Sequence, residues 1–419
     1  MPGYLDRHRA QRLMAEQGLD ALVLAQPESI TYATGAFPGV ATFWRRAGAA
    51  FLVVPCEATS AVTAIVGDLQ AEDFKTRSQI IDVRSHPIWV ETGQFNGDPD
   101  VAAALVREDL AMGKRERHPR PAQYDLSASV GLLRDALAEH GLLKARIGLE
   151  LGFVAARDLA IFTGMMPQVS WIDATNLVER LRAMKAPREI EYLRNAAEFS
   201  RAGVCALLNA ITPGMDAARM TAIWREAALA EAGRRNLPPP ASAWAYIAVG
   251  GDGFAPGGPA REGDLIKIDV GCVIEGYSSD GGRTAVMGRA GSAAQTVYDA
   301  LRKSFDAGFA LLQPGGALSE VYRAVATTMW DAGFSTYGRG HFGHGVGASI
   351  WSEEWPFFSA DATAIAEPGM VLAFETPYYI KGLGGFIIED QILVTETGTE
   401  VMAPASRDLI EVCAVDKML

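Results

Sequence analysis

In the first part of the chain, short apolar runs alternate with segments whose apolar residues have helical spacing. Residues 7–17 have this spacing, with Leu13 and Met14 on the apolar side, and Gly18 ends the segment. Apolar runs of strand length occur at 21–24, 49–54, 61–66 and 146–149. Alternation of this kind predicts an α/β layer built on a parallel or mixed sheet.

The pattern changes around residues 173–182, where a long helix follows at about 187–208. Its early charged residues, Glu189 among them, are expected at the surface. ITPG at 211–214 ends this helix, and Asp216 is expected to cap the next one. We therefore place a domain boundary near residue 175, giving domains 1–175 and 176–419. The second domain is rich in strand patterns, at 265–273, 277–287, 371–377 and 385–395.

Two aspartates lie on the first pair of these strand patterns. Asp269 interrupts the apolar sequence LIKIDVGCV, and burying an unpaired carboxylate is costly. Asp280 follows beyond Glu275-Gly276, a plausible hairpin turn. A hairpin there can bring both carboxylates to one point. A turn or cap role is the alternative for Asp280, because glycines follow it.

The last two strand patterns repeat this anomaly. Glu375 lies in VLAFETP and Glu389 in GFIIEDQILV, at positions where the pattern requires an apolar residue. The nearby basic residues, Lys267 and Arg283, are too few to neutralise four inward acids. Two divalent cations would offset four carboxylates. Oxygen ligands with one imidazole suit Mn²⁺, Fe²⁺, Co²⁺ or Zn²⁺.

The imidazole is expected to come from His344, in the sequence GRGHFGHGVG. The flanking glycines allow the backbone to approach a site closely. After residue 140, histidine occurs only at 341 and 344, so the choice of donor is narrow. Taken alone, His344 could instead be a solvent-exposed loop residue.

Composition and charge narrow the class of protein. An apolar fraction of 49% is typical of a globular protein, and a net charge of −12 without a long basic run argues against nucleic acid as a partner. No apolar run approaches the ~18 residues of a membrane span, and no secretory signal is visible. The four cysteines form no CxxC pair, which favours free thiols. We therefore expect a cytoplasmic location without membrane contact.

Taken together, the candidate ligands resemble the five metal ligands of the creatinase/prolidase/methionine-aminopeptidase (pita-bread) family in order and spacing: Asp269, Asp280, His344, Glu375 and Glu389. The surrounding sequences IDVGCVIEGYSSDGGRT, GHGVG, PGMVLAFE and IEDQILVTETG are similar too. LRAMKAPREIEYLRNAA resembles the family's entry into its catalytic domain, and GLDALVLAQPESITYATG its N-terminal domain. The resemblance implies an α/β (α+β) protein with a creatinase-type domain, 1–175, and a pita-bread metal-binding catalytic domain, 176–419. It also implies two divalent ions, Mn²⁺ first, then Fe, Co or Zn.

Further histidines that the peptidase members carry are missing here. Trp351 and Gly340 stand at two of their positions, and His341 is the only stand-in for the second. Ile387 replaces a common arginine. In the family these groups bind substrate and move protons, so their absence affects the implied peptidase reaction and not the metals.

The resemblance implies a dinuclear metallohydrolase that cleaves an amide (C–N) bond in a dipeptide or small molecule, like Xaa-Pro dipeptidases, with a metal-bound hydroxide as nucleophile. Glu375 would carry the proton, assisted by His341 or Glu354. The alternatives are a metal-dependent lyase, since dimethylsulfoniopropionate lyases share an EWP segment like 354–356, a creatinase-like non-peptidase hydrolase, and a binding module without activity. The creatinase/prolidase branch is often dimeric, so a homodimer is expected.

Aromatic residues gather in sequence around the predicted site, at Trp351, Trp355, Phe357, Phe358, Tyr378 and Tyr379. One interpretation is a hydrophobic wall. The other is a pocket for an apolar or cationic small substrate, with Glu353 or Glu354 as charge partner. On the second interpretation the substrate-binding residues are Trp351, Glu353, Trp355 and Tyr378.

Overall fold

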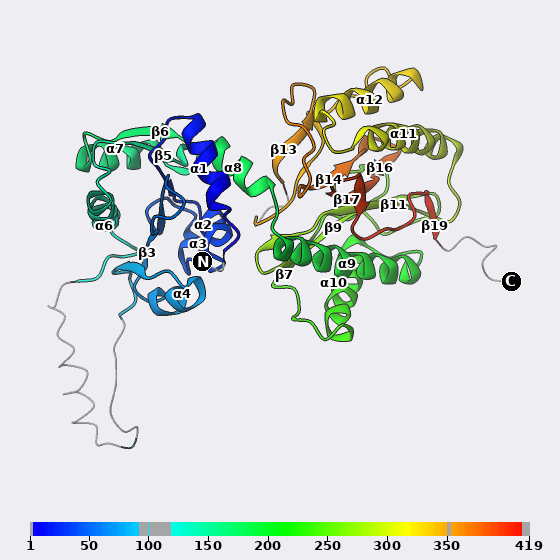
Figure 1. The fold of residues 1–419 in the computed structure, drawn as a ribbon. Coiled ribbons are helices and arrows are strands. Elements are labelled where there is room, and N and C mark those ends of the chain that lie inside the picture. Colours follow the sequence, from blue (N-terminus) through cyan, green and yellow to red (C-terminus); the bar gives the residue numbers. More distant parts are fainter. Residues whose placement is uncertain (1–2, 92–99, 101–118, 350–352, 413–419) are drawn as a thin grey trace. The chain divides into compact units, whose positions relative to one another are not determined.

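The computed structural model describes residues 3–91, 100, 119–349 and 353–412. The chain divides into two compact units, Met1–Leu181 and Arg182–Leu419 (Figure 1). The division falls within helix α8 (Thr175–Ala183), a few residues after the boundary placed near residue 175. Both units combine helices with sheets, which confirms the predicted α/β (α+β) class.

The first unit is built on a six-stranded mixed sheet of order β4-β3-β2-β1-β5-β6. β1 pairs antiparallel with β2 and parallel with β5, as predicted for a mixed sheet. Its strands are β1 (Ala21–Leu24), β2 (Phe51–Pro55), β3 (Thr63–Gly67), β4 (Asp82–His86), β5 (Arg146–Leu149) and β6 (Ser170–Asp173). Its helices are α1 (Arg7–Glu16), α2 (Pro27–Thr34), α3 (Ala41–Trp44), α4 (Ala71–Ser78), α6 (Leu126–Glu139), η1 (Leu151–Phe153) and α7 (Ala156–Met165). Every residue of β1, β2 and β3 is buried, which explains why these runs show no polar alternation.

The second unit is built on an eleven-stranded sheet whose main path is β10-β9-β11-β17-β14-β12-β13. Its strands are β7 (Ser242–Ala245), β8 (Ala248–Val249), β9 (Leu265–Ile274), β10 (Tyr277–Ser278), β11 (Gly281–Met287), β12 (His341–Gly345), β13 (Glu354–Ser359), β14 (Val371–Glu375), β17 (Glu389–Val394), β18 (Thr399–Val401) and β19 (Ile410–Val412). β15 (Tyr378–Ile380) and β16 (Gly384–Phe386) form a separate two-stranded sheet. The helices are α9 (Pro187–Ala210), α10 (Ala217–Arg234), α11 (Ser292–Leu311) and α12 (Leu318–Asp331).

Two pairs of helices cover this sheet, α9 with α10 and α11 with α12 (Figure 1). Ile266, Ile268 and Val270 of β9 pack in one apolar cluster with residues of α9 and α10. Leu372 and Phe374 of β14 belong to a second cluster with residues of α11 and α12. Because side chains alternate along a strand, the residues next to these apolar anchors face the other way. The acids at 269 and 375 are such residues.

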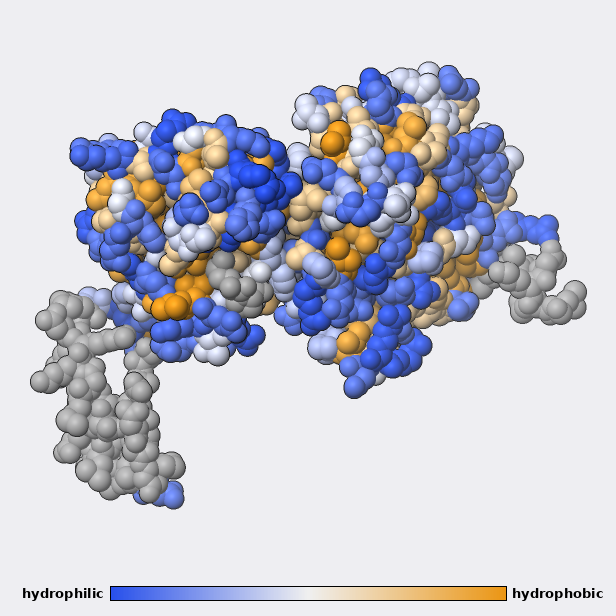
Figure 2. Space-filling view, viewed as in Figure 1, coloured by the Kyte–Doolittle hydropathy of each residue, from blue (hydrophilic) through white to orange (hydrophobic). Residues whose placement is uncertain are grey.

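Hydrophilic residues cover most of the visible face of each unit, with apolar residues exposed between them (Figure 2). None of the helices in the described ranges has the length and apolar character that crossing a membrane requires. Cys56, Cys205 and Cys272 are free thiols, as predicted, and Cys413 lies outside the described residues.

An acid caps the start of both α9 and α10. Asp216 caps α10 by accepting a hydrogen bond from the Arg219 amide, as predicted. Glu189 of α9, expected at the surface, is instead buried. Its carboxylate accepts a 2.7 Å bond from the Ala186 amide and a 2.9 Å bond from the Tyr277 hydroxyl. Glu189 therefore caps the start of α9 from the third helical position, and these two hydrogen bonds replace those that water would make to its carboxylate.

Candidate metal centre

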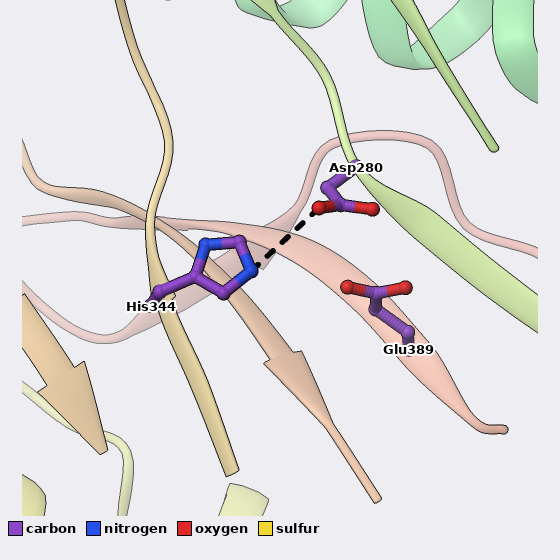
Figure 3. Close-up of side chains that lie close together, drawn as sticks. All are labelled: Asp280, His344 and Glu389. Atoms are coloured by element: carbon purple, nitrogen blue, oxygen red, sulfur yellow. Dashed lines mark ion pairs between the residues drawn. The ribbon is translucent and has the colours of Figure 1, made fainter. Parts of the chain in front are cut away.

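A break between two strands positions Asp280. The β9–β10 hairpin turns at Glu275 and Gly276, both with positive φ, as the sequence predicted. The strand predicted over 277–287 is interrupted after Ser278 and resumes at Gly281. The Asp280 amide donates a 3.1 Å bond to the Gln391 side chain, which fixes the break against β17. Asp280 is thereby buried and directed toward His344 and Glu389 instead of continuing the strand alternation (Figure 3).

His344 lies in β12, between β13 and β14. Its Nδ1 lies 3.0 Å from the Gly345 carbonyl oxygen, a contact in which Nδ1 donates and Nε2 is left as a lone-pair donor. Nε2 lies 3.6 Å from Asp280 Oδ2 (Figure 3). Burial lowers the pKa of His344, which favours the neutral form that binds metals. The flanking glycines are needed here, since a Cβ at Gly345 would lie 2.6 Å from the Trp355 carbonyl oxygen.

Glu389 completes a group of three. Ligand atoms of Asp280, His344 and Glu389 all lie within 4.8 Å of one another, and their side chains point into one space (Figure 3). Oε2 of Glu389 is buried without a hydrogen-bond partner. Burial and the charges of Asp280, Asp269 and Glu375 raise its pKa well above the usual value. The donor set fits a divalent cation, because it combines a neutral imidazole with two converging carboxylates, one of which has an unsatisfied buried oxygen.

Glu375 lies beside this group because β14 and β17 place it directly opposite Glu389. Arg339 NH2 lies 3.2 Å from Glu375 Oε1, and His341 Nδ1 lies 3.8 Å from the same oxygen. Burial raises the pKa of Glu375 to about 7, although Arg339 acts in the opposite direction. A carboxyl of this pKa can both accept and release a proton near neutral pH.

Asp269 has a partner from its own strand. Lys267 precedes it by two residues on β9, so both side chains leave the same face, and Nζ lies 2.7 Å from Asp269 Oδ2. Burial opposes the charge on Lys267, but Asp269 and Tyr379 outweigh it and raise the pKa of the amine. Lys267 is therefore a buried ammonium group at the edge of the metal centre.

Basic residues are fewer than the four acids, as the sequence indicated, but one of the two basic residues named there was the wrong one. Lys267 neutralises Asp269, and Arg339 neutralises Glu375. Arg283, the other basic residue considered near the site, instead pairs at 2.6 Å with Asp390. The sequence did not reveal Arg339 because it lies in the loop before β12, and its partner Glu375 is on β14, far along the chain.

The metal centre opens into a pocket of about 640 Å³ within the second unit. The residues at its wall include the acids and His344 together with two cations, a further acid and four aromatic residues, namely Lys267, Arg339, Glu353, Trp244, Tyr246, Phe254 and Tyr379. Trp244 and Tyr246 were missed in the sequence, although their alternation in SAWAY is a strand signal. Glu353, predicted to bind substrate, is at this wall.

The other predicted substrate and proton-transfer residues are placed differently. Trp355 and Tyr378 pack against the hydrophobic cluster under α11 and α12, while the neighbouring Tyr379 faces the pocket. The Glu354 carboxylate pairs with Arg182 and Lys185 and is not part of the pocket wall. Trp351 lies outside the described residues. Roles for these residues in substrate binding or catalysis stay predictions.

We expect Gly282→Ala to weaken metal binding about tenfold or more, because metal affinity is sensitive to groups around the ligands. A Cβ at Gly282 would lie 2.9 Å from Glu389 Oε2 and 2.6 Å from Ile387 Cδ1, so the carboxylate must move. Gly281→Ala is the matched control, since a Cβ there meets nothing within 4 Å. Calorimetric titration of chelator-treated protein with Mn²⁺ measures both affinities. Equal affinities in the two variants would contradict this geometry.

We also expect the metal-free protein to lose stability as the pH rises from about 4.5 to about 7. A Glu375 with a pKa near 7 keeps its proton in this window, whereas the unfolded chain releases it near the ordinary value of 4.5. The folded state then binds more protons than the unfolded state, so the free energy of unfolding falls with pH. Glu389→Gln removes one titrating group and should flatten the dependence. Urea unfolding with chelator at several pH values tests this, and parallel curves for wild type and variant would refute it.

Comparison with known proteins agrees with this architecture. Residues 191–396 match the sequence model of metallopeptidase family M24, and residues 7–184 match the creatinase/prolidase N-terminal domain. A probable dipeptidase PepE of Mycobacterium tuberculosis is 30% identical over 322 residues, which cover 74% of this chain and 82% of that protein. An ectoine hydrolase of Halomonas elongata is 24% identical over 418 residues, or 94% of each chain.

The fold has solved counterparts as well. The structure of an Xaa-Pro dipeptidase from Bacillus anthracis superposes with a TM-score of 0.75 at 20% sequence identity, covering 97% of this chain and 99% of that one. Both sequence models, the PepE relative and the shared fold agree on one assignment. The chain belongs to the creatinase/prolidase family of M24 metallopeptidases and is a metallohydrolase.

Proposed function

We propose that this chain is a metal-dependent hydrolase that cleaves the amide bond of a dipeptide or similarly small molecule, in the manner of Xaa-Pro dipeptidases. The observation that carries the proposal is the convergence of Asp280, His344 and Glu389 at the wall of a 640 Å³ pocket. A pocket of this volume suits a small ligand and not a folded protein. The names of the PepE and Bacillus anthracis relatives support a dipeptide as the substrate.

A bound divalent ion would supply two effects, lowering the pKa of water from 15.7 towards ~7 and polarising the substrate carbonyl. Mn²⁺ is our first choice, with Fe, Co or Zn as alternatives. His344, Asp280 and Glu389 would hold the ion. Asp269 and Glu375 complete the five-residue set that the sequence predicts to hold two divalent ions.

Proton transfer is assigned to Glu375. Its carboxylate is at the pocket wall directly opposite Glu389, where it would take a proton from the attacking water and deliver it to the leaving nitrogen. Arg339, 3.2 Å from Oε1, keeps the carboxylate oriented between these two events. His341 approaches the same oxygen and would assist. The aromatic residues at the pocket wall would exclude water and receive an apolar side chain, with Glu353 as partner for a cationic group.

A second candidate is a non-peptidase reaction on the same fold, either a creatinase-like hydrolysis or a lyase reaction of the dimethylsulfoniopropionate type. It is favoured by the composition of the pocket wall, where His344 is the only histidine among the residues that the structure describes. Substrates of Xaa-Pro peptidases would find few imidazole donors here. The relative named as an ectoine hydrolase, which aligns over 94% of each chain, supports this candidate. A cytoplasmic homodimer remains a prediction for either reaction.

Product analysis separates these candidates. We would incubate Mn²⁺-loaded protein with Xaa-Pro dipeptides, other dipeptides, small cyclic amides and a sulfonium acid, and identify products by mass spectrometry. A free amine indicates hydrolysis, and an alkene-bearing acid indicates elimination. Metal-loaded protein that turns over none of these amides would refute amide hydrolysis.

Glu375→Gln should lower turnover by about 10²-fold or more, because the amide cannot carry the proton. Glu226→Gln on the exposed part of α10 is the matched control and should retain full activity. Circular dichroism establishes that both variants are folded. Retention of activity in Glu375→Gln would exclude the proposed proton carrier.

A further inference from the structure

Four charged side chains are buried together at the start of the second unit. They are Arg182 in the last turn of α8, Lys185 after this helix, Glu189 in the first turn of α9 and Glu354 at the start of β13. The Lys185 and Glu354 side chains are only 1% and 8% exposed. The charges of the other three residues all act on Lys185. We call these four residues the entry cluster, in which two cations balance two acids.

Glu354 is the member of the entry cluster that both cations contact. Its carboxylate accepts a hydrogen bond from Arg182, and Lys185 Nζ lies 3.6 Å from its Oε2. Arg182 also donates a hydrogen bond to the Ala348 carbonyl oxygen. A Cβ at Gly347 would clash with Glu354 Oε2 and lie 3.1 Å from Lys185 Cε. The backbone at 347–348 is therefore packed against these side chains and bonded to one of them.

The entry cluster is connected to His344 through one residue. Gly345 pairs with Glu354 in the sheet, and a Cβ at Gly345 would lie 3.2 Å from the Glu354 carbonyl oxygen. The carbonyl oxygen of Gly345 is also the group that lies 3.0 Å from His344 Nδ1 and orients the imidazole. A displacement of Glu354 would thus be transmitted to the orientation of His344.

A second connection leads to Asp280. The Ser278 amide donates a 3.1 Å hydrogen bond to a carbonyl oxygen of the segment 347–348, and Tyr277 forms a bridge with the same segment. The Tyr277 hydroxyl donates to Glu189 of the entry cluster. Tyr277 and Ser278 form β10, which ends at the strand break that positions Asp280. The entry cluster therefore holds the chain on both sides of this contact.

We propose that the entry cluster is a positioning device for the metal centre, which acts through Gly345 on His344 and through β10 on Asp280. Its residues neither bind the ion nor touch the substrate. The inference deepens the proposed function, because it rests on the metal ion that the proposed hydrolysis requires. For Glu354, this positioning role replaces the assistance in proton transfer that the sequence suggested.

Charge pairing makes the entry cluster sensitive to the loss of a single member. A buried ammonium that loses its carboxylate partner is strongly disfavoured. In Glu354→Gln, Lys185 would therefore move towards water and displace the backbone at 347–348 that packs against it. Removing both charges in Lys185→Met/Glu354→Gln leaves Arg182 and Glu189, which balance each other. The double variant should consequently disturb the metal centre less than Glu354→Gln alone.

The first test is the Mn²⁺ affinity of chelator-treated protein, measured by calorimetric titration. Glu354→Gln should bind Mn²⁺ about tenfold more weakly than wild type, as expected when groups around metal ligands are changed. Lys185→Met/Glu354→Gln should recover most of this loss. Glu191→Gln is the matched control, because it removes an exposed ion pair with Arg188 on α9. Its affinity should equal that of wild type.

The second test does not depend on the folding of Glu354→Gln. Arg182→Lys keeps the positive charge, but the shorter side chain cannot reproduce the bonds to Glu354 and to the Ala348 carbonyl oxygen. We expect its Mn²⁺ affinity to fall several-fold. Urea unfolding of each variant separates positioning from mere stabilisation. Lower stability with unchanged Mn²⁺ affinity would mean that the entry cluster only supports the fold, and would overturn the inference.

The outcomes separate this inference from the proposed function. Wild-type Mn²⁺ affinity in a folded Glu354→Gln or in Arg182→Lys, or a double variant weaker than both single variants, would overturn the positioning role and leave metal-dependent hydrolysis standing. The expected series of affinities without turnover of any amide would support the positioning role and refute amide hydrolysis. A wild type that binds no Mn²⁺ would overturn both.

Discussion

The gathering of four carboxylates at one site, three of them buried, is the constraint on which the second unit depends. Glu375 and Glu389 are fully inside the protein, opposite each other on neighbouring strands, and their pKa values are raised because the surroundings cannot solvate the ionised forms. Such a group is stable only if cations are brought to it. The structure supplies two of them from its own side chains, Lys267 and Arg339, and Asp280, His344 and Glu389 converge where a metal cation would fit.

The apolar packing of the helices holds this costly arrangement in place. Ile266, Ile268 and Val270 anchor β9 under α9 and α10, and Leu372 and Phe374 anchor β14 under α11 and α12. A shift of either strand by one residue would turn its apolar residues away from the helices. The same shift would turn the acids into the core. The register that satisfies the hydrophobic clusters thus also directs Asp269 and Glu375 to the site, whereas Asp280 is positioned by the strand break and its hydrogen bond to Gln391.

The sequence predicted those site residues that interrupt an apolar strand pattern. Asp269, Glu375 and Glu389 each interrupt an apolar strand, and the structure places all three at the pocket wall. Features that depend on distant segments could not be predicted in this way. The pairing of Arg339 with Glu375, and of Glu354 with Arg182 and Lys185, joins elements that only the folded sheet brings together. For the same reason Glu189 was expected outside, since the strand that covers it lies far along the chain.

Lys267 differs from these cases because its relation to Asp269 was already visible. Two residues that are two positions apart on a strand share a face, so an inward aspartate requires an inward lysine. Resemblance to a ligand motif draws attention to the residues that match the motif. Lys267, which is not part of the motif, was therefore not considered as the partner of Asp269. Counting the charges on the shared face includes both. At a polyacidic site, the cations that the chain itself provides therefore have to be counted together with the acids.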